Sequence, residues 1–395
     1  MANKLTKRQK NKLNKAAMKH WRVVVAILVI LVMFVTIAYF MGWLDKWFKK
    51  DPILSTAGGY STTVNELKDI QVNFLDIGQG DCIIIELPDG KNMIIDSGEH
   101  NSCQDVIKDF TDENNIDTFD YLLLTHQDSD HAGNMNWVID NYQVNYIFRP
   151  NNYSSHKNSA DLPADFNTST SGAYVSSTKT YSEFMVSAYN EKCTVEVFNK
   201  DSDFSNELVY NDNKYSYSFN FWTPTADRDK IDYSGPNDYS PIMTLHYGDN
   251  VIMFTGDAEL ENLEEYVSTY GSENNIDVLK VGHHGSENAT TLDFIKAIDP
   301  EFAVIQCGLD NSYGHPHAET LDILKNHEGG IDVYRNDTNG TITLNVSISE
   351  KISSSSFSME KTDCSGNLVP GVKPSEKSLD FRYDEYLANK KLLVA

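Results

Sequence analysis

The sequence has few cysteines, and none of them stand close enough together to indicate a zinc ribbon. Its 395 residues include five cysteines and no C-x-x-C pair. Cys82 and Cys307 lie inside apolar, strand-like runs, so we expect both to be small buried core residues. The odd total leaves at least one cysteine without a partner in its own chain.

The loops that usually hold nucleotides are also absent. The chain contains neither G-x-x-x-x-G-K-[ST] nor G-x-G-x-x-G, and it has no internal repeat. These absences argue against a P-loop enzyme, a dinucleotide-binding domain and a solenoid. Hydrophobic residues make up 40% of the chain, which is enough for a sizeable core in one large α/β domain with appended segments.

Positive charge is scarce outside the first 50 residues. The whole chain has 33 Lys and Arg against 57 Asp and Glu, a formal net charge of −24. Residues 1–50 hold eleven of the basic residues and one acid, Asp45, so the remainder carries 22 basic and 56 acidic residues, a net charge of −34. A surface this negative repels polyanions and attracts cations.

Residues 23–44 form a run of 22 without a charged side chain. As a helix this run would span roughly 33 Å, about one hydrocarbon core. Eight Lys and Arg precede it and three closely follow it, which predicts a cytoplasmic N-terminus and an extracellular domain. The alternative is a cleavable signal peptide, but the run exceeds the usual ~7–15-residue apolar region and no small-x-small site closes it. We therefore expect a single-pass anchor in the cell membrane.

The remaining chain predicts a mixed-sheet α/β domain. We expect a basic cytoplasmic segment at 1–22, a linker at 45–69, the domain at 70–350 and a tail at 351–395. Strand-like apolar runs lie at 71–77, 82–88, 92–98, 121–126, 217–224, 242–248, 251–257, 277–282, 302–308 and 340–346, and helix-like stretches at 103–110, 259–270, 291–298 and 318–326. Hairpins mixed with strand–helix alternation favour a mixed sheet over a doubly wound parallel sheet.

Residues 151–240 differ from the rest of this domain. They are rich in Ser, Tyr, Asn and Asp and contain few strong apolar runs. This composition predicts a variable insertion or lid, or alternatively a loosely ordered surface excursion.

Potential metal ligands follow the strand-like run that ends at residue 125. His126, Asp128, Asp130 and His131 stand within six residues. Imidazole nitrogens and carboxylate oxygens are the ligands that borderline and hard divalent metals take. The alternative is a solvated acidic turn in which Asp128 or Ser129 caps a helix.

Three later strand ends carry residues of the same kind. They are Asp257, the pair His283 and His284 with Ser286, and His315 with His317. The carboxyl ends of strands form the rim where α/β sites collect. The alternatives are that the carboxylate caps the helix that starts near Glu259, and that the last two histidines belong to a surface turn.

The order FLDIGQGDCIII, IIDSG, LLLTHQDSDHAGN, IMFTGD, LKVGHHGS and YGHPH resembles the metallo-β-lactamase domain of the competence-type DNA-uptake proteins, the ComEC/Rec2 family. The resemblance runs from about residue 72 to about 346. It implies an αβ/βα four-layer sandwich with one or two divalent metal ions at one edge of two facing sheets. The metal ligands it implies are His126, Asp128, Asp130, His131, Asp257 and either His283 or His284, with Asp96 as a carboxylate that supports the site.

The chain departs from the superfamily's general H-x-H-x-D-H pattern. Asp128 stands in place of the second histidine, and Ser240 stands where a further histidine ligand is usual, as in the competence-like branch. The position held by His126 and Asp128 is therefore short of nitrogen ligands, whereas the set Asp130, His131, Asp257 and His284 is complete. Replacing imidazole by carboxylate shifts preference from Zn²⁺ toward harder ions, so Zn²⁺ and Mn²⁺ both stay open.

These ligands and the resemblance predict a metal-dependent hydrolase that acts through an activated water. We expect Asp130 to accept or orient the proton of that water and His315 to assist the leaving group. Ser240, Ser286 and His317 are the expected substrate contacts.

The substrate stays open between classes. The resemblance implies a phosphodiester such as DNA, but nucleic-acid affinity normally rests on Lys and Arg, which are scarce here. Three interpretations remain: a surface nuclease, a hydrolase of another phosphodiester such as a cell-wall polymer substituent, and a catalytically weak binding or sensor module.

Overall fold

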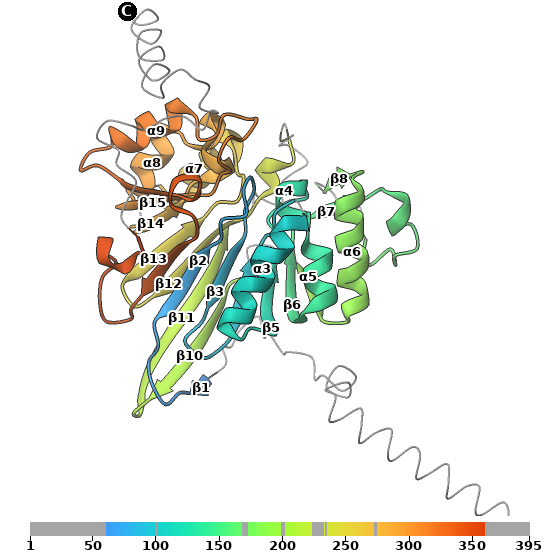
Figure 1. Ribbon diagram of the computed structural model, residues 1–395, viewed down its shortest axis with the longest axis horizontal. Helices are drawn as coiled ribbons and strands as arrows, with labels where there is room; N and C mark the ends of the chain where they lie inside the picture. Colours follow the sequence, from blue (N-terminus) through green and yellow to red (C-terminus); the bar gives the residue numbers. More distant parts are fainter. Residues whose placement is uncertain are drawn as a thin grey trace, which may run out of the picture. The chain divides into compact units, whose positions relative to one another are not determined.

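The computed structural model describes residues 61–99, 101–167, 173–198, 202–222, 233, 235–271 and 275–359 (Figure 1). Within these ranges the chain forms two large mixed sheets. One has the order β1 (Ser61–Thr63), β10 (Phe204–Tyr210), β11 (Asn213–Trp222), β12 (Ile242–Tyr247), β13 (Asn250–Phe254), β14 (Val278–Lys280), β15 (Phe302–Ile305) and β16 (Asp332–Arg335). The other has the order β17 (Ile342–Val346), β2 (Ile70–Phe74), β3 (Ile83–Glu86), β4 (Asn92–Ile95), β5 (Thr118–Leu123), β6 (Gln143–Arg149) and β9 (Thr194–Val197).

Apart from the short edge strand β1, which pairs parallel with β10, each sheet is antiparallel on one side and parallel on the other. Strands β10 to β13 pair antiparallel and β13 to β16 pair parallel. In the second sheet, β17 to β4 pair antiparallel and β4, β5, β6 and β9 pair parallel. This arrangement confirms the mixed-sheet prediction. It also brings the carboxyl ends of several parallel strands to one edge of each sheet.

Three apolar clusters divide the domain into four layers. Ile83 and Ile85 of β3 belong to the cluster between the sheets, whereas Ile84 points to the helices α3 (Asn101–Asn114), α5 (Met135–Asn141) and α6 (Lys179–Glu191). On the other sheet, Ile252 and Phe254 of β13 face inward, and Met253 faces α7 (Leu260–Tyr270), α8 (Leu292–Ile298) and α9 (Ala318–Lys325). Alternating apolar residues therefore bury both faces of each sheet, and Figure 1 shows the two helical layers outside them.

The region expected to be an insertion is largely part of the sandwich. Within 151–240 lie α6, β9, β10 and β11, which belong to the core layers. A strand-like run at 217–224 indicated β11, but β10 gave no such signal because its buried residues Phe204, Asn206 and Leu208 alternate with more exposed ones. Such a strand needs no continuous apolar run. The small two-stranded sheet of β7 (Asn152–Ser154) and β8 (Tyr174–Ser176) lies outside the two large sheets.

The ends of the described domain are tied into its sheets. Strand β1, which falls in the expected linker, pairs with β10, and Phe357 of the expected tail forms a β-bridge with Leu344. No helix among the described residues is long and apolar enough to cross a membrane. The predicted anchor at 23–44 and the chain beyond 359 lie outside the described residues.

Phe148 joins the two sheets, so its truncation should destabilise the domain. The ring, on β6, stacks on Phe204 of the opposite sheet at a centroid distance of 5.8 Å and also contacts Phe221 at 5.3 Å. We expect Phe148→Ala to lower the free energy of unfolding by about 3–5 kcal/mol in urea denaturation followed by circular dichroism. The control Val175→Ala removes a side chain that is 55% exposed and should change it by less than about 0.5 kcal/mol. Equal midpoints for the two variants would contradict this role.

Candidate metal centre

The predicted ligands come from loops at the carboxyl ends of strands in both sheets. The seven-stranded sheet contributes Asp96 after β4 and the His126–His131 segment after β5, which runs into the short helix α4 (Ser129–Ala132). The eight-stranded sheet contributes Asp257 after β13 and the pair His283 and His284 in the turn η4 (Gly282–Gly285) after β14. The loops meet because both sheets present the parallel ends of their strands at the same edge.

Four of the predicted ligands lie in direct contact. The Nε2 atom of His131 is 3.2 Å from both Nε2 of His284 and Oδ2 of Asp257. The same His284 nitrogen is 3.2 Å from Oδ2 of Asp130 and 3.4 Å from Oδ2 of Asp257. Ligands arranged tetrahedrally at about 2.0–2.1 Å from one ion are roughly 3.3 Å apart, so these separations suit one shared metal ion.

A second, wider arrangement surrounds the same carboxylate. Nε2 of His126 is 3.8 Å from Oδ2 of both Asp257 and Asp128, and Nε2 of His283 is 3.7 Å from Oδ2 of Asp257. The Asp128 side chain is 39% exposed, whereas His126 is fully buried. The structure thus brings His126 and Asp128 near the centre, but less closely than the first four.

The alternative of simple helix capping does not describe these carboxylates. Asp128 occupies the N-cap position of α4, but its side chain makes no capping hydrogen bond. The N-cap position of α7 is Glu259, not Asp257, and Oδ1 of Asp238 accepts the backbone N–H groups of Glu259 and Asn262. Asp128 and Asp257 therefore keep their oxygens for other partners.

Some buried ligand atoms at the centre have no hydrogen-bond partner among the described residues. They include Nε2 of His126 and Oδ1 of Asp257. A buried polar atom left unsatisfied costs about 1–3 kcal/mol, so native structures rarely keep one without a reason. A divalent cation takes both atoms as ligands, and the residues present therefore fit such an ion.

Two buried carboxylates contact the Nδ1 atoms of two ligand histidines and so orient their rings. Oδ2 of Asp96 is 2.7 Å from Nδ1 of His131, and Asp96 also accepts the N–H and hydroxyl of Thr125. Oδ1 of Asp81 is 3.2 Å from Nδ1 of His284, and that nitrogen also lies 3.0 Å from the carbonyl oxygen of Gln306. Each contact leaves Nε2 of the imidazole directed at the centre, which is the arrangement typical of metal-binding histidines.

Sequence reasoning missed Asp81 and its partner Lys280. Nζ of Lys280 is 2.6 Å from Oδ2 of Asp81, and both side chains are almost completely buried. One ligand atom each from Asp81, His131, Asp257 and His284 lies within 4.8 Å of the other three. The available signal was a lysine inside the apolar strand DVLKVG, because a buried charge needs a charged partner.

The backbone is strained at three positions of the site. Asp96, His283 and His284 adopt φ values of 56°, 45° and 53°, in the left-handed region that non-glycine residues avoid. Such conformations cost on the order of 1–3 kcal/mol each and cluster where side-chain placement matters for function. Gly80 is needed for a related reason, since a Cβ there would lie 2.3 Å from the carbonyl oxygen of Asp130.

The centre stabilises positive charge. Burial would raise the pKa of Asp257, but His131, His284 and His283 hold it well below its usual range. Burial would lower the pKa values of His131 and His284, but Asp257, with Asp96 or Asp81, holds them well above the ordinary histidine value. Burial lowers the pKa of His126, which favours the neutral form that binds metals. A cation is the ligand that this charge arrangement favours.

The remaining predicted residues lie around the centre in different roles. The His315 ring is 5.3 Å from that of His283, and burial together with neighbouring histidines lowers its pKa to about 3. Its Nδ1 has no hydrogen-bond partner within the described part of the chain. The three predicted substrate contacts each accept a backbone N–H: Ser240 Oγ that of Asp257, Ser286 Oγ that of Asn288, and His317 Nδ1 that of Glu287. Ser240 is fully buried, so it positions Asp257 and offers no surface to a substrate.

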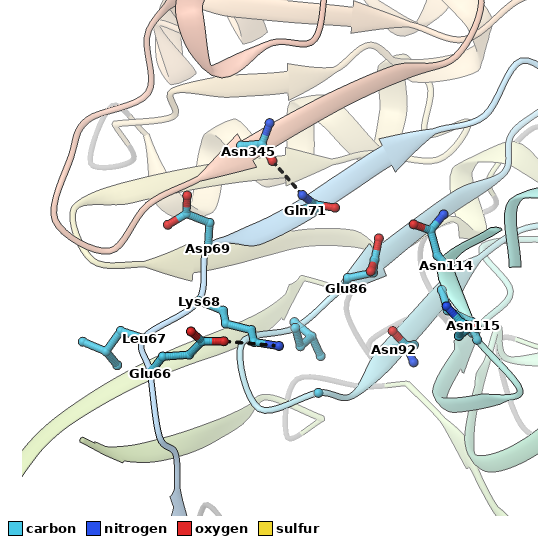
Figure 2. Close-up of a pocket in the computed structure, with 13 residues that line it drawn as sticks. Glu66, Leu67, Lys68, Asp69, Gln71, Glu86, Asn92, Asn114, Asn115 and Asn345 are labelled. Carbon is cyan, nitrogen blue, oxygen red and sulfur yellow. Dashed lines mark hydrogen bonds and ion pairs between the residues drawn. The ribbon is translucent and has the colours of Figure 1, made fainter. Parts of the chain in front are cut away.

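A cavity of about 550 Å³ lies at the opposite edge of the seven-stranded sheet (Figure 2). Its walls include Gln71 at the start of β2, Asn92 at the start of β4 and Glu86 at the end of β3. The metal centre follows the other end of β4, so this cavity does not take part in it.

Loss of the Asp81 carboxylate should weaken metal binding. Asp81→Asn removes the charge that faces Nδ1 of His284 and leaves buried Lys280 without its counter-ion. We expect affinities for Zn²⁺ and Mn²⁺, measured by chelator competition, to fall roughly 10- to 100-fold, the usual effect of such supporting residues. Asp105→Asn, a change at an exposed site on α3, should leave both affinities unaltered. Wild-type affinity in Asp81→Asn would remove Asp81 from the site.

Comparisons with known proteins agree with this geometry. Residues 75–183 match the Metallo-beta-lactamase superfamily. The chain is 28% identical over 288 residues to ComE operon protein 3 of Bacillus subtilis (strain 168), which covers 69% of this chain and 32% of that protein. The matches to Recombination protein 2 of Haemophilus influenzae and to Competence protein ComA of Neisseria gonorrhoeae are 25% over 266 residues and 24% over 273 residues. These two cover 66% and 69% of this chain, and 27% and 31% of the relatives.

The chain thus spans about a third of the length of the curated relatives it matches. Residues 75–183, which match the superfamily, include the segment His126–His131 that follows β5. Together, the profile match and these three relatives show that the chain is a metallo-β-lactamase-fold protein similar to the competence proteins.

Proposed function

We propose that this chain is a membrane-anchored, metal-dependent phosphodiesterase that acts outside the cytoplasm, with nucleic acid as its substrate. The observation that carries the proposal is the convergence of His131, His284, Asp130 and Asp257 at separations of 3.2–3.4 Å. The unsatisfied atoms of His126 and Asp257 support a metal ion at that point.

The residues divide the work of hydrolysis. His131, His284, Asp130 and Asp257 would hold the ion, and His126 with Asp128 would hold a second one more weakly. When bound, a divalent cation supplies a Lewis acid for the phosphoryl oxygen and lowers the pKa of a water molecule. The Asp130 side chain is 23% exposed at the rim, so its carboxylate can orient the attacking water or take its proton.

His315 suits a different task from the one expected of a general acid. Burial, together with the neighbouring histidines, lowers the pKa of His315 to about 3, which favours the neutral imidazole. Its Nδ1 has no partner among the described residues and can hydrogen-bond to the departing or phosphoryl oxygen. We therefore assign His315 the stabilisation of a developing charge through a hydrogen bond.

The nucleic-acid substrate rests on the relatives, whose names refer to competence and recombination. The net charge of −34 beyond residue 50 favours a second candidate, the hydrolysis of a smaller phosphodiester such as a cell-wall polymer substituent. A small diester brings one negative charge to the site, and a metal ion alone can offset that charge.

Membrane attachment rests on the apolar run at 23–44 and the basic residues before it. Protease added to intact cells should digest the chain beyond residue 60 and spare the first 22 residues. Full resistance of the domain in intact cells, with digestion after lysis, would contradict this topology.

Removal of a central ligand should abolish hydrolysis without unfolding the domain. We expect His131→Ala and Asp257→Asn to lower metal-dependent hydrolysis of bis(p-nitrophenyl) phosphate and of DNA by at least about 100-fold, because both residues contact the shared ligand position. Chelator should have the same effect on the wild-type protein. The control is His327→Ala. His327 follows α9 and contacts Asp299, which follows α8, and its replacement should leave activity unchanged. Normal turnover in either ligand variant would refute the assignment.

The metal preference should depend on residue 128. Asp128→His restores the nitrogen ligand of the general superfamily pattern at the wider position, next to His126. We expect elemental analysis to show increased zinc per chain in this variant. Unchanged zinc stoichiometry would mean that Asp128 does not line a metal position.

A further inference from the structure

The loop that follows β15 exposes two large apolar side chains. Leu309 is 69% exposed and Tyr313 is 65% exposed, the highest values among the exposed large hydrophobic residues of the described chain. The loop also carries His315, whose ring lies beside those of His283 and His284. Single exposed apolar residues are common on proteins, but these two share one short loop at the metal centre.

The exposure of Tyr313 does not come from a loosely held loop. Oδ1 of Asn311 accepts the backbone N–H groups of Tyr313 and His315 at 3.1 and 3.0 Å. Nδ2 of Asn311 donates to the carbonyl oxygens of Gly308 and His315 at 2.9 and 2.6 Å. The backbone N–H of Gly308 in turn donates to Oε1 of Gln79. These hydrogen bonds hold the loop backbone together and tie it to the loop that carries Gln79. The backbone at Tyr313 is therefore well held.

The ring of Tyr313 continues a series of rings that begins at the metal centre. It stacks on His315 with a centroid distance of 5.6 Å and an interplanar angle of 20°. His315 is in turn 6.1 Å from His284, at 31°. The Tyr313 ring thus lies on the solvent side of His315, within two ring contacts of a metal ligand, with much of its surface free.

We propose that Tyr313, together with Leu309 of the same loop, is a stacking subsite for a nucleobase next to the phosphodiester held at the metal centre. This inference rests on the proposed function and names the part of the substrate that the site recognises. An aromatic side chain binds any base through its face, and this contribution requires no positive charge.

The subsite removes the difficulty that the acidic surface raises. The metal ions would hold the phosphodiester and Tyr313 would hold the base, so few Lys and Arg are needed. Bases inside a duplex are stacked on each other and are not accessible to a protein ring. The substrate is therefore single-stranded or has unpaired terminal nucleotides.

The test compares a single-stranded oligonucleotide with an abasic oligomer of equal length, which has the same backbone and charge but no bases. Fluorescence anisotropy gives the affinity of the full-length, metal-loaded protein for each, and gel analysis gives the cleavage rate. We expect wild type to prefer the base-bearing strand and Tyr313→Ala to lose affinity for it by roughly 5- to 100-fold. Tyr313→Phe should keep the preference, because the ring remains. Leu309→Ala should reduce it by less.

Tyr189→Ala serves as the matched control, since it removes another exposed tyrosine, on α6, and should change neither affinity. Equal affinity of wild type and Tyr313→Ala for the base-bearing strand would overturn the subsite, whether or not either oligomer is cleaved. If Tyr313→Ala loses the preference for the base-bearing strand but wild type cleaves neither oligomer, the subsite is supported and the phosphodiesterase is rejected. Cleavage of both oligomers at equal rates and affinities would keep the enzyme and reject the subsite.

Discussion

Four imidazole nitrogens face one carboxylate oxygen, Oδ2 of Asp257, at separations of 3.2–3.8 Å. Two of the histidines, His126 and His131, follow a strand of one sheet, and the other two follow a strand of the opposite sheet. The cluster therefore exists only once the sheets have packed face to face. Three features hold the ligands at this place. They are the apolar cluster between the sheets, Gly80, which lets the Asp130 carbonyl approach, and the strained turn at His283.

Much of this arrangement could be predicted from the sequence because the ligands follow apolar strands closely. His126 to His131 come directly after β5 and Asp257 comes soon after β13, and the carboxyl ends of parallel strands gather at one edge of a sheet. Asp81 and Lys280 could not be paired in this way, since Asp81 precedes β3 of one sheet and Lys280 ends β14 of the other. Strand β10, within 151–240, was missed because its buried residues Phe204, Asn206 and Leu208 alternate with more exposed ones and give a weak apolar signal.

The predicted substrate contacts show a further limit of sequence reasoning. Ser286 stands two residues from His284 in the chain, and the side chains of Ser240, Ser286 and His317 all accept a backbone N–H. Proximity in sequence does not reveal whether a hydroxyl points to the substrate or to the backbone behind it. Tyr313 is the opposite case, because its residue type attracts no notice in a sequence and only its exposure marks it.

The short strand β1 has a consequence for where the domain can work. Pairing with β10 fixes the chain at Ser61, so sixteen residues, 45–60, separate the sheet from the predicted anchor. Even fully extended, a segment of that length reaches no more than about 55 Å. If the proposed anchor holds the chain in a membrane, the linker length therefore sets the greatest distance from the membrane surface at which the domain can meet a substrate.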